Sequence, residues 1–161
     1  MQMAKFSRIT MEVNGTKFQR EVEARKLLVD FLREDLDLLG THVGCEHGVC
    51  GSCTILFNGR TVRSCLIFAI QADGAEIMTV EGLAENGKLH SIQEAFRDYH
   101  GLQCGFCTPG MLMTAYEFLH ENPDPTKEEA RKAVSGVLCR CTGYKQVVDS
   151  VMAAAAVMNS K

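Results

Sequence analysis

The sequence has no long basic run, no long apolar run and none of the short motifs that mark common catalytic sites. Its 161 residues include 17 Lys and Arg against 20 Asp and Glu, so the formal charge is −3. This balance disfavours binding to nucleic acid. The chain also lacks a recognisable Ser/His/Asp set, phosphate loop, GxGxxG motif or paired carboxylates. We therefore expect neither a nucleic-acid-binding protein nor an enzyme of those classes.

Signals for a membrane span or for export are also missing. The most apolar segment, residues 147–158, is interrupted by Asp149 and Ser150 and is too short to span a bilayer. Residues 1–8 contain no apolar stretch of the kind found in secretory signals. The sequence therefore predicts a protein without a membrane span in a reducing compartment, the cytoplasm.

Cysteine is the residue type in excess, with eight copies. In a reducing compartment thiols stay unpaired, so metal ligation is a better explanation than disulfides. The cysteines divide into two sets of four. The first set is Cys45, Cys50, Cys53 and Cys65, and the second is Cys104, Cys107, Cys139 and Cys141.

Hydrophobic periodicity divides the chain in the same way. Alternating residues predict strands on either side of Asn14-Gly15, then a helix from Ala24 to a stop at Gly40. Short strands are expected over 54–57, 61–65 and 76–80.

The second half of the chain shows only helical patterns. Residues 92–99, 111–119 and 147–155 each have an apolar face, and Thr126 begins a capping box for one more helix. Thr108 is expected as an N-cap before Pro109. We predict an α+β protein with one domain over residues 1–80 and an all-α domain over 81–161.

The first cysteine set has the C-x4-C-x2-C spacing of plant-type [2Fe–2S] ferredoxins, followed by a distant fourth cysteine. Gly44, Gly48 and Gly51 provide the unusual backbone angles needed to turn N–H groups toward sulfur. A four-cysteine zinc site is the alternative, but zinc sites usually join two compact pairs.

The second set combines Cys104-x2-Cys107 with Cys139-x-Cys141, and its spacing alone leaves zinc and [2Fe–2S] equally open. A thioredoxin-like redox pair would need a βαβ context and would leave two cysteines unexplained. We expect Cys107 to precede a helix N-terminus, whose dipole stabilises thiolate charge.

Other candidate ligands are few. His42 and His47 flank the first set and could replace two cysteines as in a Rieske centre, but four cysteines are already present. Arg140 lies between two candidate ligands, so it either donates to cluster sulfur or to a partner, or is a solvated surface residue.

The cysteines belong to three longer motifs, CEHGVCGSCT (45–54), QCGFCTPGM (103–111) and LCRCTGY (138–144). In this order the motifs resemble the iron–sulfur subunit of the xanthine oxidase family of molybdenum hydroxylases. The similarity extends over about residues 6–158. Ser52 departs from the family pattern, where Ala is commoner, but it is not a ligand.

The resemblance implies a β-grasp ferredoxin-like domain and a four-helix domain, each holding one [2Fe–2S] cluster. It implies a large partner subunit with a molybdopterin (cytosine dinucleotide) molybdenum cofactor and a medium subunit with FAD, in a heterotrimer that can dimerise. It also implies that Gln103 and Cys141 contact the pterin. The chain would transfer electrons from molybdenum to FAD and would not be catalytic alone.

Two other functions are compatible with the residues themselves. The chain could be a stand-alone ferredoxin-like carrier for an unrelated reductase, or a zinc-stabilised interaction module. Substrates in the family include N-heteroaromatic compounds, aldehydes and carbon monoxide. A short separate chain favours an N-heterocycle or carbon monoxide as substrate.

Overall fold

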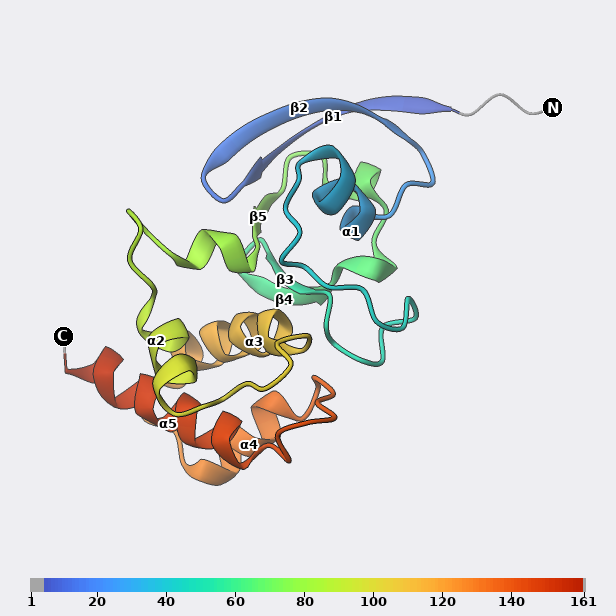
Figure 1. The fold of residues 1–161 in the computed structure, drawn as a ribbon. Coiled ribbons are helices and arrows are strands. Elements are labelled where there is room, and N and C mark those ends of the chain that lie inside the picture. Colours follow the sequence, from blue (N-terminus) through green and yellow to red (C-terminus); the bar gives the residue numbers. More distant parts are fainter. Residues whose placement is uncertain (1–4, 161) are drawn as a thin grey trace.

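A computed structural model describes residues 5–160 as a mixed α/β structure, with a five-stranded sheet and five helices (Figure 1). Residues 1–4, half of the N-terminal segment in which no secretory signal is expected, lie outside this range. The strands are β1 (Phe6–Val13), β2 (Thr16–Glu23), β3 (Thr54–Phe57), β4 (Arg60–Arg63) and β5 (Glu76–Met78). The helices are α1 (Leu28–Asp30), α2 (Ser91–Asp98), α3 (Thr108–Glu121), α4 (Lys127–Val134) and α5 (Lys145–Asn159).

The sheet begins with the expected hairpin. β1 and β2 pair antiparallel around Asn14-Gly15, and both turn residues have positive φ, as this tight connection requires. Ile9, Met11 and Val13 are buried on one face of β1. The period-two pattern therefore identified the strand and its inward face correctly.

The predicted helix over 24–40 is shorter than expected. α1 continues into a π-helical turn, η1 (Phe31–Asp35), and the helical backbone ends there. Gly40 is therefore not the helix stop. A Cβ at Gly40 would lie 2.5 Å from Val80 Cγ1, so the glycine permits a close approach between distant segments.

The sheet order is β2-β1-β5-β3-β4, in which β5 runs parallel to β1 and antiparallel to β3. β3 and β4 form the second expected hairpin. The predicted strand over 61–65 was too long, because Ser64 and Cys65 lie in a 3-10 turn, η2 (Ser64–Leu66). This turn places Cys65 off the end of the sheet.

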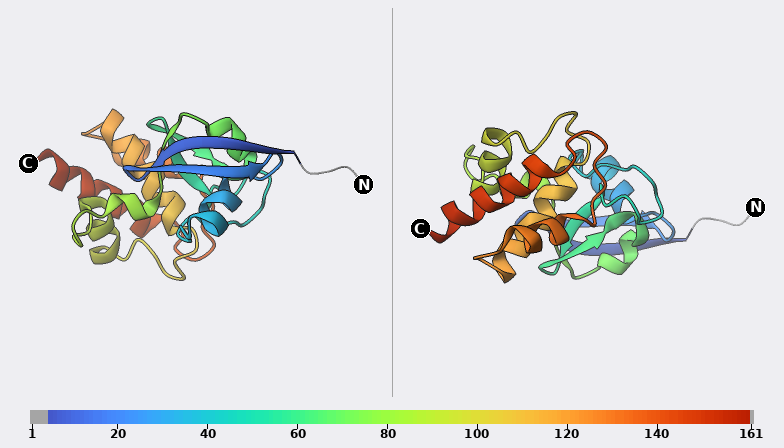
Figure 2. Two further views of the ribbon diagram at one scale, coloured as in Figure 1. Left: turned by 90° about the horizontal axis from the view of Figure 1, so that it is seen from above. Right: turned by 90° about the horizontal axis from the view of Figure 1, so that it is seen from below.

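Helices α2–α5 gather at one side of the sheet (Figure 2). The Thr126 capping box is confirmed, since Glu129 N–H donates to Thr126 Oγ1 and Thr126 N–H donates to Glu129 Oε2. Tyr99 lies beyond α2 and is 54% exposed, so it does not share the buried face of that helix. None of the described helices is long and apolar enough to cross a membrane.

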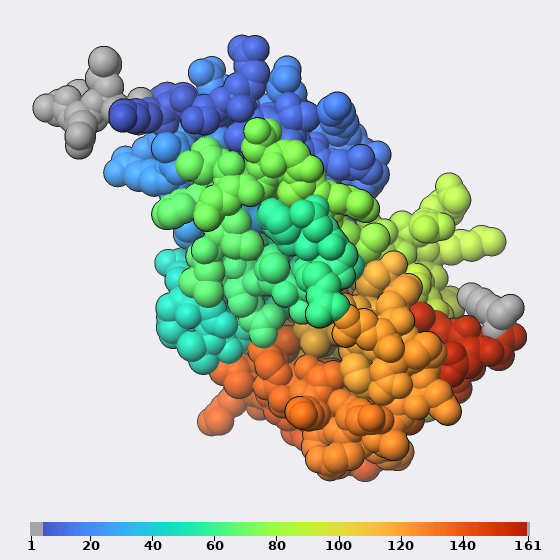
Figure 3. All heavy atoms as spheres, turned by 180° about the vertical axis from the view of Figure 1, so that it is seen from behind, coloured from blue at the N-terminus to red at the C-terminus, as the bar shows by residue number. Residues whose placement is uncertain are grey.

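Two hydrophobic cores meet at β3. Ile55 packs with the strands and α1, whereas its neighbour Leu56 packs with α2–α5 on the other face. Strand alternation therefore joins the two cores through one short strand. Seen from behind, the green β3–β5 region lies directly against the orange helical region (Figure 3).

Candidate metal centres

The first four cysteines gather at one end of the β3–β4 hairpin. Cys45 and Cys50 lie in the loop before β3, Cys53 directly precedes β3, and Cys65 lies in η2 after β4. The hairpin returns the chain to its start, and Ser64 donates hydrogen bonds from N–H and Oγ to the Cys53 carbonyl. A local hairpin thus brings a cysteine eleven residues away back to the loop.

Backbone N–H groups in this loop point at sulfur, as expected. Cys50 N–H donates to Cys45 Sγ at 3.4 Å. The N–H groups of Cys50 and then His47 lower the pKa of the Cys45 thiol to about 6. Gly48 and Gly51 have positive φ, but Gly44 does not. A Cβ at Gly44 would lie 3.1 Å from Cys50 Sγ, so close approach explains that glycine.

The second four cysteines come from two loops. Cys104 and Cys107 precede α3, and Cys139 and Cys141 lie between α4 and α5. The Sγ atoms of Cys104 and Cys141 are 3.5 Å apart, and both residues are exposed. The helices therefore bring together two cysteine pairs that are widely separated in sequence.

Cys107 is itself the N-cap of α3, so Thr108 is the first helical residue rather than the cap. The expected position beside a helix N-terminus is confirmed, but the expected effect on charge is not. Burial, followed by the neighbouring Cys139 thiol, raises the pKa of Cys107 to about 12. Burial likewise raises the pKa of Cys65 to about 11. A bound metal ion would overcome this, because coordination deprotonates a thiol.

Thr142 and Tyr144 organise the second loop, and the sequence reasoning assigned no role to either. Burial disfavours charge on Cys139, but the hydroxyl and N–H of Thr142 outweigh it and lower the pKa of that thiol. Tyr144 OH accepts from Cys139 N–H at 2.8 Å and donates to Val137 O at 3.1 Å. Their only sequence signal was their place directly after the cysteines.

Within each set, the cysteine side chains interact in pairs. Side-chain interactions join Cys45 to Cys50 and Cys53 to Cys65 in the first set. A zinc site needs four ligands around one ion, whereas a [2Fe–2S] cluster shares four thiolates between two irons. The donor set therefore fits [2Fe–2S] better than zinc.

The remaining candidates do not point at the thiols. Nδ1 of His47 lies against the Cys45 carbonyl, and Nδ1 of His42 against the Phe106 carbonyl. These contacts do not suit Rieske-type ligation. Arg140 is exposed and has no hydrogen bond or ion pair with a described residue, which disfavours donation to a cysteine sulfur.

The two cysteine-bearing regions touch each other. Leu138 N–H donates to the Cys50 carbonyl at 2.8 Å. A Cβ on Gly110 would lie 2.4 Å from the Gly51 carbonyl oxygen, and a Cβ on Gly51 would lie 2.5 Å from the Gly136 carbonyl oxygen. The turn that follows Cys50 thus fits between α3 and the loop before Cys139 only because these positions lack side chains.

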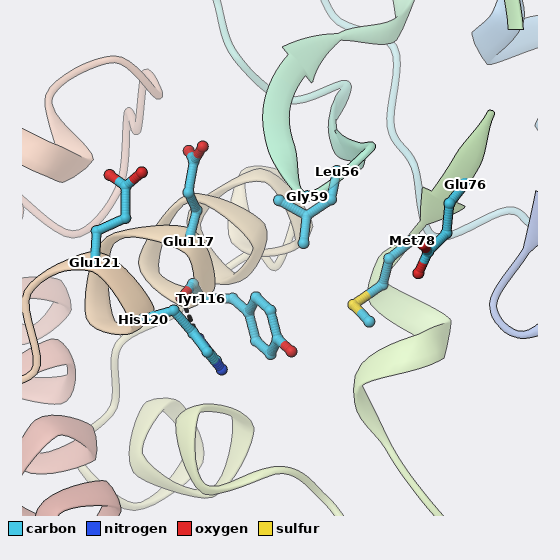
Figure 4. A pocket seen from close by; sticks show the side chains of 8 residues that line it. All are labelled: Leu56, Gly59, Glu76, Met78, Tyr116, Glu117, His120 and Glu121. Carbon is cyan, nitrogen blue, oxygen red and sulfur yellow. Dashed lines mark hydrogen bonds between the residues drawn. The ribbon is translucent and has the colours of Figure 1, made fainter.

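A separate pocket of about 280 Å³ lies between the sheet and α3 (Figure 4). Leu56, Met78 and Tyr116 form its apolar part, and Glu117 and His120 reach it from α3. It is lined by no cysteine, so it is distinct from both candidate centres.

The fold brings the eight cysteines into two separate loop regions, four in each, and the comparison with known proteins identifies what these regions bind. The family described as "2Fe-2S iron-sulfur cluster binding domain" matches residues 11–84, and the family described as "[2Fe-2S] binding domain" matches residues 79–152. The chain therefore has two [2Fe–2S]-binding regions.

Individual relatives are similar over nearly their whole length. The nicotine 6-hydroxylase small subunit of Paenarthrobacter nicotinovorans is 54% identical, over 95% of this chain and 92% of the relative. The caffeine dehydrogenase subunit gamma of Pseudomonas sp. (strain CBB1) is 54% identical, over 89% and 87%. The crystal structure of quinoline 2-oxidoreductase from Pseudomonas putida 86 matches with a TM-score of 0.93 at 50% identity, over 96% and 97%. The chain belongs to the iron–sulfur subunits of the xanthine oxidase family of molybdenum hydroxylases.

Proposed function

We propose that this chain is the electron-transfer subunit of a multi-subunit molybdenum hydroxylase that oxidises an N-heteroaromatic compound. The observation that carries the proposal is the hydrogen bond from Leu138 to Cys50, which joins the two cysteine-bearing regions within one chain. When bound, the two [2Fe–2S] clusters supply one-electron carriers between a molybdenum centre and FAD on partner subunits. The chain's own residues hold the clusters, shield them and set their separation.

We assign the first cluster to Cys45, Cys50, Cys53 and Cys65, and the second to Cys104, Cys107, Cys139 and Cys141. The pairwise association of thiols and the inward N–H groups support both assignments. We place the boundary between a β-grasp ferredoxin-like domain and a four-helix domain at residues 80 and 81. The division into a strand-based core and a helix-based core supports it.

Surface residues beside the second set support a partner subunit there. Phe106 is 46% exposed and Leu138 is 54% exposed, and each is next to a candidate ligand. Large exposed apolar side chains of this kind are typical of surfaces that a partner covers. We propose that the molybdenum subunit, with a molybdopterin cytosine dinucleotide cofactor, binds here, and that a medium FAD subunit completes a heterotrimer.

Gln103 and Cys141 are the proposed pterin contacts. Both are exposed, and Gln103 directly precedes Cys104, whose sulfur lies 3.5 Å from that of Cys141. The Gln103 side chain makes no hydrogen bond to another residue of the 5–160 range, so its donor and acceptor groups are open to a partner. A role in capping a local helix or loop therefore lacks support.

The substrate class rests on the relatives, whose names include nicotine, caffeine and quinoline. The cytoplasmic location stays a prediction. The test is to purify the complex anaerobically and mix it with each of these three heteroaromatic compounds while following cluster absorbance. Bleaching by at least one of them supports the proposal. Bleaching by dithionite alone, in a chain that purifies without molybdenum, would instead identify a stand-alone carrier.

A further inference from the structure

His42 makes a second link between the two cysteine-bearing regions, separate from the Leu138 hydrogen bond. Its Nδ1 lies 2.8 Å from the carbonyl oxygen of Phe106, 64 residues further along the chain. The two rings stack with centroids 5.0 Å apart and planes 21° apart. His42 lies three residues before Cys45, and Phe106 lies between Cys104 and Cys107. One side chain therefore spans from the first loop to the second.

The geometry fixes the direction of this hydrogen bond. A carbonyl oxygen can only accept, so Nδ1 of His42 carries a proton and donates it. The Phe106 carbonyl belongs to the same peptide unit as the N–H of Cys107, the residue whose thiol is a proposed ligand of the second cluster. A peptide unit whose carbonyl accepts a hydrogen bond becomes a stronger donor through its N–H. His42 thus acts on Cys107 through one peptide unit.

Phe106 packs the loop that carries Cys104 and Cys107 against the loop that carries Cys45 and Cys50. A Cβ on Gly44 would lie 3.4 Å from Phe106 Cε1 and 3.1 Å from Cys50 Sγ. The Phe106 ring therefore lies over the backbone of the first loop, close to one of its candidate ligands. The N–H of Phe106 also lowers the pKa of the Cys104 thiol. Moving Phe106 would therefore disturb the loop that carries both Cys104 and Cys107.

We infer that His42 is a positioning residue for electron transfer, which holds the second cluster loop against the first and raises the reduction potential of the second cluster. The inference rests on the proposed function, since it assigns the cysteine sets to two clusters. N–H donors stabilise the more negative, reduced form of a cluster, so a stronger Cys107 donor favours reduction.

Three substitutions separate the hydrogen bond from the ring contact. His42→Ala removes both, His42→Gln keeps an N–H donor without the ring, and His42→Phe keeps the ring without the donor. The matched control is His120→Ala. His120 also places Nδ1 2.8 Å from a carbonyl, that of Tyr116, and contacts the Tyr116 ring, but it lines the pocket of Figure 4.

The experiment is a redox titration of the purified complex, with each cluster followed by its own low-temperature EPR signal. His42→Ala should lower the potential of the second cluster, shifting the electron distribution between clusters about threefold, or ~28 mV at 59 mV per tenfold. His42→Gln should restore most of the shift, and His42→Phe should not. His120→Ala should match the unmodified complex.

An unchanged potential in His42→Ala, or rescue by Phe rather than Gln, would overturn the inference. If His42→Ala loses the second cluster altogether, the potential of that cluster is compared between His42→Gln and His42→Phe. A nearly normal potential in His42→Gln with a lowered one in His42→Phe supports the inference, and the reverse overturns it. The splitting between the two EPR signals is the second readout, because it reports how closely the two cluster loops are held. It should change in His42→Ala and stay normal in His42→Phe, which keeps the ring contact. Absence of both signals in the unmodified complex would overturn the proposed function itself.

Discussion

The backbone N–H of Leu138 donates a 2.8 Å hydrogen bond to the carbonyl oxygen of Cys50. Leu138 directly precedes Cys139, so this bond joins a ligand of one proposed cluster to the neighbour of a ligand of the other. Both groups are backbone atoms, so apart from Leu138→Pro no substitution removes them. What substitutions can change is the packing that keeps the two segments at this distance.

Gly110→Ala should therefore destabilise the protein by about 1–3 kcal/mol, the usual cost of overpacking. Alanine is the better helix former, but the new Cβ would lie 2.4 Å from the Gly51 carbonyl oxygen, which cannot rotate away. Gly136→Ala is the matched control, because its Cβ would meet only the flexible end of Arg63 at 3.2 Å. Urea unfolding of the cluster-loaded protein measures both. Equal stability of the two variants would contradict the tight junction.

Cys50→Ser should remove one EPR signal and loosen the sheet region, whereas Cys107→Ser should remove the other signal and loosen the helices. Each core is small and depends on its own metal site. Hydrogen exchange located in each region, combined with EPR, measures the effect. Loss of both signals from a variant that remains folded would disprove the division into two sets.

Gln103→Leu should slow cluster reduction by substrate about fivefold in the assembled complex. That factor corresponds to one lost hydrogen bond of about 1 kcal/mol. Reduction by dithionite should keep its normal rate, because the ligands of both clusters remain. Rapid-mixing absorbance compares the two reductants. A substrate-driven rate equal to that of the unmodified complex would argue against a pterin contact.

His47→Ala should act at the flavin end of the electron-transfer route and slow electron transfer from the clusters to FAD. His47 is exposed beside the first set, and its ring contacts the Cys45 carbonyl. The same rapid-mixing experiment should show normal reduction of the clusters by substrate and delayed reduction of FAD. If His47→Ala slowed cluster reduction by substrate and Gln103→Leu did not, the first cluster, and not the second, would be the one that receives electrons from molybdenum.

Local patterns in the sequence predicted most of the fold. The two Asn-Gly hairpins, the alternation of Ile9, Met11 and Val13, and the Thr126 capping box all correspond to observed elements. These signals were reliable because each depends on residues only a few positions apart. Element ends were less predictable. Cys65 lies in a 3-10 turn beyond the end of β4 and not in the strand predicted over 61–65.

Contacts between distant segments could not be predicted from the sequence. His42 was considered only as a possible ligand, because nothing near it marks Phe106 as its partner. Gly40 was taken for a helix stop, although its role is to admit Val80. The burial of Cys107, which raises the pKa of its thiol, was likewise not visible in the sequence. In each case tertiary packing decided the outcome.

The most direct test of the account is the metal content of the purified chain. Two complete sets of four thiols predict about four iron and about four acid-labile sulfide per chain, with two distinct EPR signals after reduction. Elemental analysis combined with a sulfide assay gives the answer in one preparation. One or two zinc ions per chain without sulfide would contradict the electron-transfer function and leave a zinc-stabilised interaction module in its place.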